Sequence, residues 1–145
     1  MKSDAELREA ALRLLARREH TRSELTRKLT SRGWPSARVG ELLDDLASEG
    51  LQSDVRFATE HLRSRVARGY GPRKIRAELR QRGVSRTLAS QALQAAEVDW
   101  GEVALEIYRA RFGEETPEDT AERARRWRSM ERRGFPADTI AGLLE

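Results

Sequence analysis

Positively charged side chains gather in the middle of this 145-residue chain, where they could bind anions. Residues 51–100 hold 10 basic and 5 acidic residues, a net charge of +5, whereas residues 1–50 and 101–145 carry +1 and −2. Nearly all the basic residues are arginines, whose planar guanidinium can bind a phosphate or a carboxylate through two hydrogen bonds. The candidate binding residues are Arg63, Arg65, Arg68, Arg73, Lys74, Arg76, Arg80 and Arg82.

Three of these arginines share one flank of a predicted helix. At 100° per residue, and with Ile75 facing the core, the shared flank carries Arg73, Arg76 and Arg80. Two other copies of this helix occur in the chain, and only the middle copy has arginine at these three positions. The matching residues are Ser23, Thr26 and Thr30 in the first copy and Ala124, Trp127 and Glu131 in the third. A surface for a polyanion or an acidic protein and a merely solvated face both remain open.

A second possible contact involves aromatic side chains. Phe57, His61 and Arg68 share another face of the helix that precedes the arginine flank. We expect this face to pack against a neighbouring unit of the chain. The alternative is an exposed aromatic and arginine surface that contacts a partner.

The residue types needed for catalysis are not brought together by the sequence. His20 and His61 are isolated and the chain has no cysteine, so the usual metal-ligand spacings are missing. The segment 69–74 superficially resembles a phosphate-binding loop, but it lacks the Walker spacing and a preceding strand. No nucleophile has a plausible base beside it. We therefore expect neither an enzyme nor a protein with a metal or cofactor.

A repeated pattern positions the basic residues. A helix end of the form Arg-Gly-apolar occurs three times, with the glycines 50 and then 51 residues apart: Arg32-Gly33-Trp34, Arg82-Gly83-Val84 and Arg133-Gly134-Phe135. A helix C-terminus favours both a cation and a glycine with positive φ. The period predicts tandem units over residues 1–52, 53–98 and 99–145, of which the second is basic. Each unit would be only marginally stable by itself.

Each unit has the pattern of three helices, and no segment shows the alternation typical of a strand. In the first unit, a capping box from Thr21 to Glu24 opens the second helix. In the third unit, we expect a long helix from Thr116 to Arg133. The expected inward stripe of the middle unit's first helix comprises Val55, Ala58, Leu62 and Val66. The sequence thus predicts an all-α protein with nine helices in three three-helix units.

The cellular setting is also suggested by composition. The absence of cysteine fits a reducing cytosol. The first residues have no apolar signal core, and no apolar run is long enough to cross a bilayer. We expect a soluble cytoplasmic protein that makes no membrane contact and works as a monomer.

An ordered set of residues along most of the chain resembles the RecX family of bacterial regulators of the RecA recombinase. The third unit departs most, with Arg126 at the position of Leu25 and Ile75. The segments that carry the resemblance are Leu14-Leu15-Ala16-Arg17-Arg18-Glu19-His20-Thr21-Arg22-Ser23-Glu24-Leu25, Lys28-Leu29, Arg32-Gly33, Asp54, Arg56-Phe57-Ala58, Arg65, Gly69-Tyr70-Gly71-Pro72, Ile75, Glu78-Leu79, Arg82-Gly83-Val84 and Asp99-Trp100.

The resemblance implies three tandem, winged-helix-like units in an elongated, curved molecule. It also implies binding along the groove of a RecA–DNA filament, with inhibition of ATP hydrolysis, strand exchange and SOS co-protease activity. Two alternatives stay open. One is a helix-turn-helix protein that binds DNA without RecA through the helix from Ser85 to Ala96. The other is a structural adaptor that uses apolar faces alone.

Overall fold

The computed structural model describes residues 3–145, and in this range the α-helix is the only regular secondary structure. The all-α prediction is confirmed. The helices are α1 (Asp4–Arg17), α2 (Arg22–Ser31), α3 (Ser36–Ser48), α4 (Asp54–Ala67), α5 (Pro72–Gln81), α6 (Arg86–Ala95), α7 (Trp100–Phe112), α8 (Thr120–Arg132) and α9 (Ala137–Leu143).

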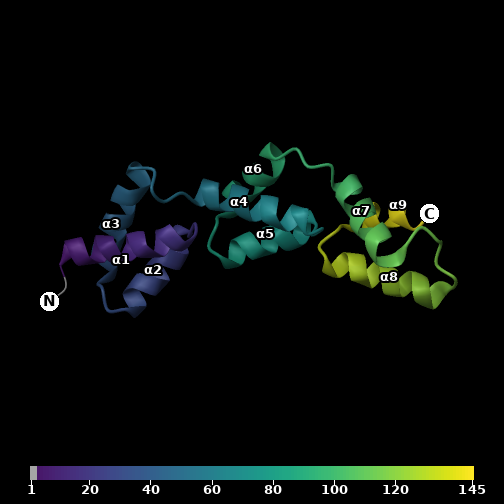
Figure 1. Cartoon of the computed structure of the whole chain (residues 1–145), viewed down its shortest axis with the longest axis horizontal. Coiled ribbons are helices and arrows are strands. Elements are labelled where there is room, and N and C mark those ends of the chain that lie inside the picture. The colour runs from purple at the N-terminus through teal and green to yellow at the C-terminus, as the bar shows by residue number, and fades with distance from the viewer. Residues whose placement is uncertain (1–2) are drawn as a thin grey trace.

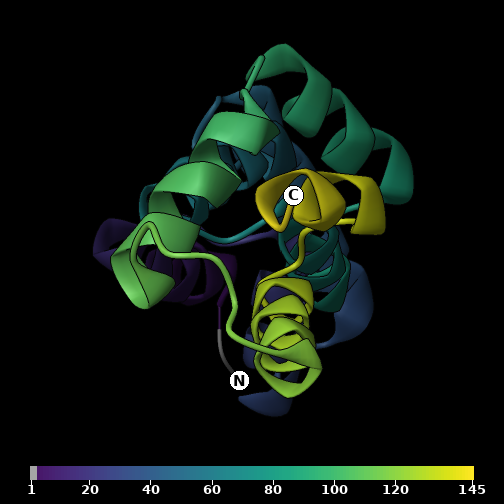
Figure 2. The same ribbon diagram turned by 90° about the vertical axis from the view of Figure 1, so that its right-hand side faces the viewer.

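Each set of three consecutive helices encloses its own hydrophobic cluster. We call α1–α3 repeat 1, α4–α6 repeat 2 and α7–α9 repeat 3. The repeats follow one another in an elongated row, with the two chain ends at opposite ends of the molecule (Figure 1). Figure 2 views this row from repeat 3. Trp100 links neighbouring repeats because it packs against both the second and the third cluster.

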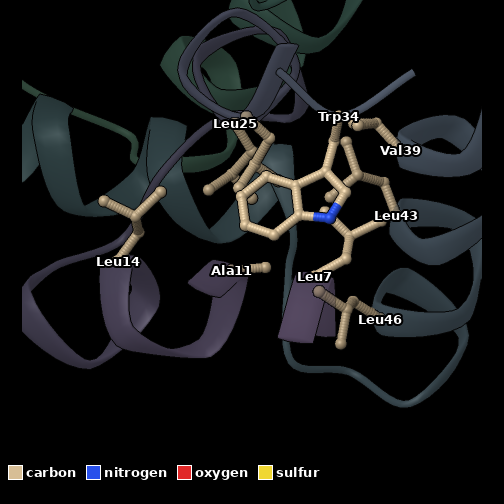
Figure 3. Close-up of a cluster of buried hydrophobic side chains, with 9 residues drawn as sticks. Leu7, Ala11, Leu14, Leu25, Trp34, Val39, Leu43 and Leu46 are labelled. Atoms are coloured by element: carbon tan, nitrogen blue, oxygen red, sulfur yellow. The ribbon is translucent and has the colours of Figure 1, made fainter. Parts of the chain in front are cut away.

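The core of repeat 1 shows how the amphipathic helices meet. Leucines from all three helices surround the indole of Trp34, which is 7% exposed (Figure 3). The corresponding residues of the other repeats are Val84 and Phe135, and both are buried. Burying a large apolar side chain contributes roughly 1.5–3 kcal/mol, so the residue after each Arg-Gly turn helps to hold its repeat together.

The expected inward stripe of α4 is partly wrong. Val55 was expected to face the core, but it is 55% exposed, and Phe57 is buried instead. The buried residues of α4 are Phe57, Ala58 and Leu62. At 100° per residue, the centre of this face lies nearest Ala58, and Val55 and Val66 fall on the flank away from Phe57. The aromatic side chain fills more of the core than valine could.

Helix α8 begins later than its sequence pattern suggested. Instead of Thr116, the first helical residue is Thr120, because the Asp119 side chain accepts a hydrogen bond from the Glu122 amide at 2.8 Å and caps the helix. Arg126 does occupy the core-facing position, where it is only 7% exposed. Its guanidinium donates to the Tyr108 hydroxyl at 3.0 Å and to the Glu115 carbonyl at 2.8 Å.

Repeats 2 and 3 are joined where the end of α8 meets the start of α5. The amide of Gly71 donates to the Arg133 carbonyl at 2.7 Å, and the amide of Arg73 donates to the Gly134 carbonyl at 3.0 Å. The Arg133 guanidinium also donates to the Arg68 carbonyl at 3.0 Å. Amides at a helix start lack partners within their own helix, and carbonyls at a helix end lack donors. Each helix end therefore satisfies the other.

The junction of repeats 1 and 2 places the end of α5 against the start of α2 in the same way. The Thr21 hydroxyl donates to the Arg82 carbonyl at 2.5 Å. The Arg82 guanidinium donates to Glu24 at 3.0 Å. Gly83 packs so closely that a Cβ there would lie 2.2 Å from the Cβ of Ser23. A side chain at this glycine would push the two repeats apart.

Glu24 is the charged centre of this first junction. Its side chain is 2% exposed and accepts hydrogen bonds from the Thr21 amide, from Arg18 and from Arg82. Burial by itself raises the pKa of Glu24, but the hydrogen bonds from Arg18, Thr21 and Arg82 outweigh it and hold the pKa at about 2. The carboxylate therefore stays charged while buried.

Alanine substitution should separate the contact between repeats from local backbone strain. Gly33, Gly83 and Gly134 have φ values of +100°, +91° and +100°, so alanine at any of them costs on the order of 1–3 kcal/mol in strain. Only at Gly83 and Gly134 would the new Cβ clash with the preceding repeat; at Gly33 nothing lies within 4 Å. We expect Gly83→Ala and Gly134→Ala to lower Tm by several degrees more than the control Gly33→Ala, measured by circular dichroism. Equal losses would contradict the proposed role of the glycines at the junctions.

The buried carboxylate predicts a loss of stability in acid. The pKa of Glu24 in the folded protein, about 2, lies below the ordinary value of 4.5 for this carboxyl group. Between these values the unfolded chain binds more protons, so stability falls as the pH drops from about 5 towards 2, by on the order of 3 kcal/mol. The free energy of unfolding of Glu24→Gln, measured with urea at a series of pH values, should lack this part of the pH dependence.

The control for this experiment is Glu9→Gln. The Glu9 side chain is 62% exposed and forms an ion pair with Arg13 in the same helix. A surface pair of this kind contributes little to stability. Identical pH profiles for Glu24→Gln and the unsubstituted protein would contradict the assignment to Glu24.

Candidate functional site

Helix α5 presents three arginines to solvent. Ile75 and Leu79 are fully buried, which fixes the inward face of the helix. On the outer side, Arg73, Arg76 and Arg80 are all exposed. Within residues 3–145, none of the three forms an ion pair. The sequence therefore predicted the register of this helix correctly. We call Arg73, Arg76 and Arg80 the α5 surface.

Arg65, by contrast, is engaged inside repeat 2. Its guanidinium donates to both carboxylate oxygens of Glu78, at 2.9 and 2.8 Å, and its side chain is 19% exposed. It also lies 3.9 Å from the centroid of the Tyr70 ring. Both a bidentate ion pair and stacking on an aromatic ring are strong interactions of a guanidinium group. This side chain holds α4 to α5 and leaves little of its charge available to a partner.

The remaining predicted basic residues fall into different settings. Arg82 belongs to the junction with repeat 1, where it is paired with Glu24. Arg63 is 73% exposed and lies 3.4 Å from Glu60, which is a weak surface pair. Arg68 is exposed at the end of α4, and Lys74 is half-buried with its ammonium 5.4 Å from the Tyr70 ring. The structure thus brings only part of the predicted set into one exposed surface.

Phe57 and His61 lie against the interior of repeat 2. Phe57 is 7% exposed, and its ring stacks on the His61 ring with centroids 5.8 Å apart. The His61 Nε2 atom is 3.0 Å from a carboxylate oxygen of Glu78. These contacts lie within repeat 2, whereas we expected this face to pack against a neighbouring unit. Because both side chains are engaged there, we leave them out of the proposed binding surface.

Two residues that organise this region were not singled out from the sequence. Tyr70 is surrounded by Arg65, Lys74 and Arg133, and the Arg133 guanidinium lies 4.7 Å from its ring centroid. Glu78 accepts the hydrogen bonds of Arg65. A signal for Glu78 was present in the sequence, because the matching residue of repeat 1 is Lys28, of opposite charge. Tyr70 gave no such signal, because the cations around its ring come from three separate segments of the chain.

The chemistry of the α5 surface is that of anion binding. Exposed guanidinium groups can donate paired hydrogen bonds to phosphate or carboxylate oxygens. Over residues 3–145, no group of histidine, aspartate or glutamate side chains could hold a metal ion. In the same range, no helix is long and apolar enough to span a membrane.

Comparison with known proteins places this arrangement in a family. A family model described as the first three-helix domain of RecX matches residues 2–46, and one described as its second three-helix domain matches residues 53–93. A regulatory protein RecX from Pseudomonas putida is 46% identical over 95% of this chain and 88% of its own length. Another, from Halorhodospira halophila, is 49% identical over 92% of this chain and 83% of its own length.

Solved structures show the same fold. The crystal structure of RecX from Lactobacillus salivarius superimposes with a TM-score of 0.83, at 22% identity, over 97% of this chain and 93% of that one. A second crystal structure, of a regulatory protein RecX, gives a TM-score of 0.80 at 21% identity over 97% of this chain and 72% of that one. Sequence and fold agree, and the chain belongs to the RecX family of regulatory proteins.

Proposed function

We propose that this protein binds the RecA–DNA filament and lowers its ATP hydrolysis, strand exchange and SOS co-protease activity. The observation that carries the proposal is the α5 surface, whose three exposed arginines have no ion-pair partner among residues 3–145. The relatives are named regulatory proteins, and the resemblance to RecX supplies RecA as the expected partner. No catalytic step is assigned to this chain.

The shape of the molecule suits such a partner. Three repeats in a row form an extended surface that can touch several subunits of a filament at once (Figure 1). Joined weak contacts raise the overall affinity through effective concentration. A single copy already offers this extended surface, so the proposed working form is a monomer, in the cytoplasm where RecA and DNA meet.

The helix-turn-helix alternative receives less support. Helix α6 would have to read bases, and Arg86 is the only basic residue in it. Its remaining exposed polar residues are Thr87, Ser90, Gln91 and Gln94. Binding to DNA depends strongly on neutralising phosphates, which α6 is poorly equipped to do. We therefore place the principal contact on α5.

Charge reversal of the α5 surface tests the proposal. When added below stoichiometric amounts to a preformed filament, the unsubstituted protein should lower the single-stranded-DNA-dependent ATP hydrolysis of RecA. The triple variant Arg73→Glu, Arg76→Glu and Arg80→Glu should need at least roughly ten times more protein for the same effect, because attraction becomes repulsion at three contacts. Circular dichroism should show unchanged helicity, since all three side chains are exposed.

A control for charge reversal elsewhere on the molecule is Arg13→Glu, which reverses one charge in repeat 1 at a side chain that is 77% exposed. Full inhibition by the triple variant would remove the α5 surface from the proposal. If the unsubstituted protein left RecA unaffected but bound bare duplex tightly, and Arg86→Glu abolished that binding, the helix-turn-helix alternative would replace it.

A further inference from the structure

Helix α8 carries a second row of exposed arginines, on a different flank from the α5 surface. Arg125, Arg128 and Arg132 are three and four residues apart, so they share one side of the helix, and all three are exposed. At the positions that match the α5 arginines, α8 instead has Ala124, Trp127 and Glu131. We call Arg125, Arg128 and Arg132 the α8 surface.

The net charge of repeat 3 hides this surface. Residues 101–145 are acidic overall, with a net charge of −2. Helix α8 nevertheless holds five arginines against two glutamates. The acidic residues lie mostly on α7 and in the connection that follows it: Glu102, Glu106, Glu114, Glu115, Glu118 and Asp119. Repeat 3 therefore has a basic helix beside acidic segments.

The arginines of α8 divide into engaged and unengaged side chains. Arg126 is buried, and Arg123 donates to the Leu144 carbonyl at 2.7 Å. Arg125 donates to Glu122 at 3.0 Å. In the part of the chain that the structure describes, Arg128 and Arg132 take part in no ion pair. Like charges four residues apart on a helix repel one another. An anion bound beside Arg128 and Arg132 would offset this repulsion and stabilise the helix.

Helices α5 and α8 are the second helices of their repeats, and they carry their arginines on different flanks. Around a helix axis, successive side chains are turned by about 100°. Counted from the core-facing Ile75, the side chains of the α5 surface point at roughly 100–160°. Counted from the core-facing Arg126, those of the α8 surface point at roughly 200–260°. The direction facing away from the core, at about 180°, falls between them. Helices α5 and α8 lie end to end along the same long side of the molecule (Figure 1). Relative to its own core, each helix therefore presents its arginines on a different side of the outward direction.

We propose that the α8 surface binds the sugar-phosphate backbone of a nucleic acid without sequence preference. Arg132 lies seven positions after Arg125, a rise of about 10 Å at 1.5 Å per residue. A nucleic acid presents a line of anions at short intervals, which a line of arginines can follow. Protein surfaces instead mix carboxylates with cations. This inference deepens the proposed function. It rests on that function in one respect: the proposed partner, the RecA–DNA filament, contains nucleic acid.

The test measures nucleic-acid binding by the full chain without RecA. Fluorescence anisotropy of a labelled single-stranded oligothymidylate should show binding that weakens as salt rises. The variant Arg128→Glu with Arg132→Glu should bind at least roughly tenfold more weakly, and the slope of log affinity against log salt should fall by about 1.4 for two lost phosphate contacts. Arg128→Lys with Arg132→Lys keeps the charge and should retain the slope. Arg13→Glu is the matched control.

Three outcomes would overturn the proposal. The first is unchanged affinity and slope in the charge-reversed variant with helicity intact. The second is failure of the unsubstituted protein to bind the oligonucleotide. The third is unchanged binding to the oligonucleotide together with lost inhibition of the RecA filament, which would assign the α8 surface to an acidic protein partner. If the unsubstituted protein bound the oligonucleotide as expected but had no effect on RecA, only the proposed function would be contradicted, because the anisotropy measurement itself contains no RecA.

Discussion

The structure depends on the close contact between an Arg-Gly turn and the start of a helix in the preceding repeat. The contact is possible because glycine has no Cβ: at Gly134, a Cβ would lie 2.5 Å from the backbone nitrogen of Lys74. The same residue adopts a positive φ, which turns the chain out of α8. The C-terminal end of α8 therefore reaches the start of α5.

The two junctions use different chemistry on the same plan. Between repeats 2 and 3, backbone amides and carbonyls pair directly, as Gly71 does with Arg133. Between repeats 1 and 2, side chains do this work, and the buried Glu24 collects donors from both repeats. In a row of repeats, stability is the sum of each unit and its contacts with neighbours. The first contact therefore depends on charge, while the second depends mainly on main-chain hydrogen bonds.

Arginine has two uses in this chain, and charge alone does not distinguish them. Arg65, Arg126 and Arg133 join helices or repeats through carboxylates, carbonyls and aromatic rings. The arginines of α5 and the end of α8 instead project into solvent. Binding surfaces form from the second group, because only an unpaired guanidinium has hydrogen bonds to offer without breaking others.

The sequence by itself determined the helices, their order, the period of the repeats and the register of α5, because hydrophobic spacing and capping residues act within a few positions of one another. Tertiary structure decided which arginines remain free. Arg65 meets Glu78 across 13 residues, and Arg82 meets Glu24 across 58. It also decided that Phe57 replaces Val55 in the core, since neighbouring helices set the centre of a buried face. Local pattern places a side chain on its helix, but only the packed chain supplies its partner.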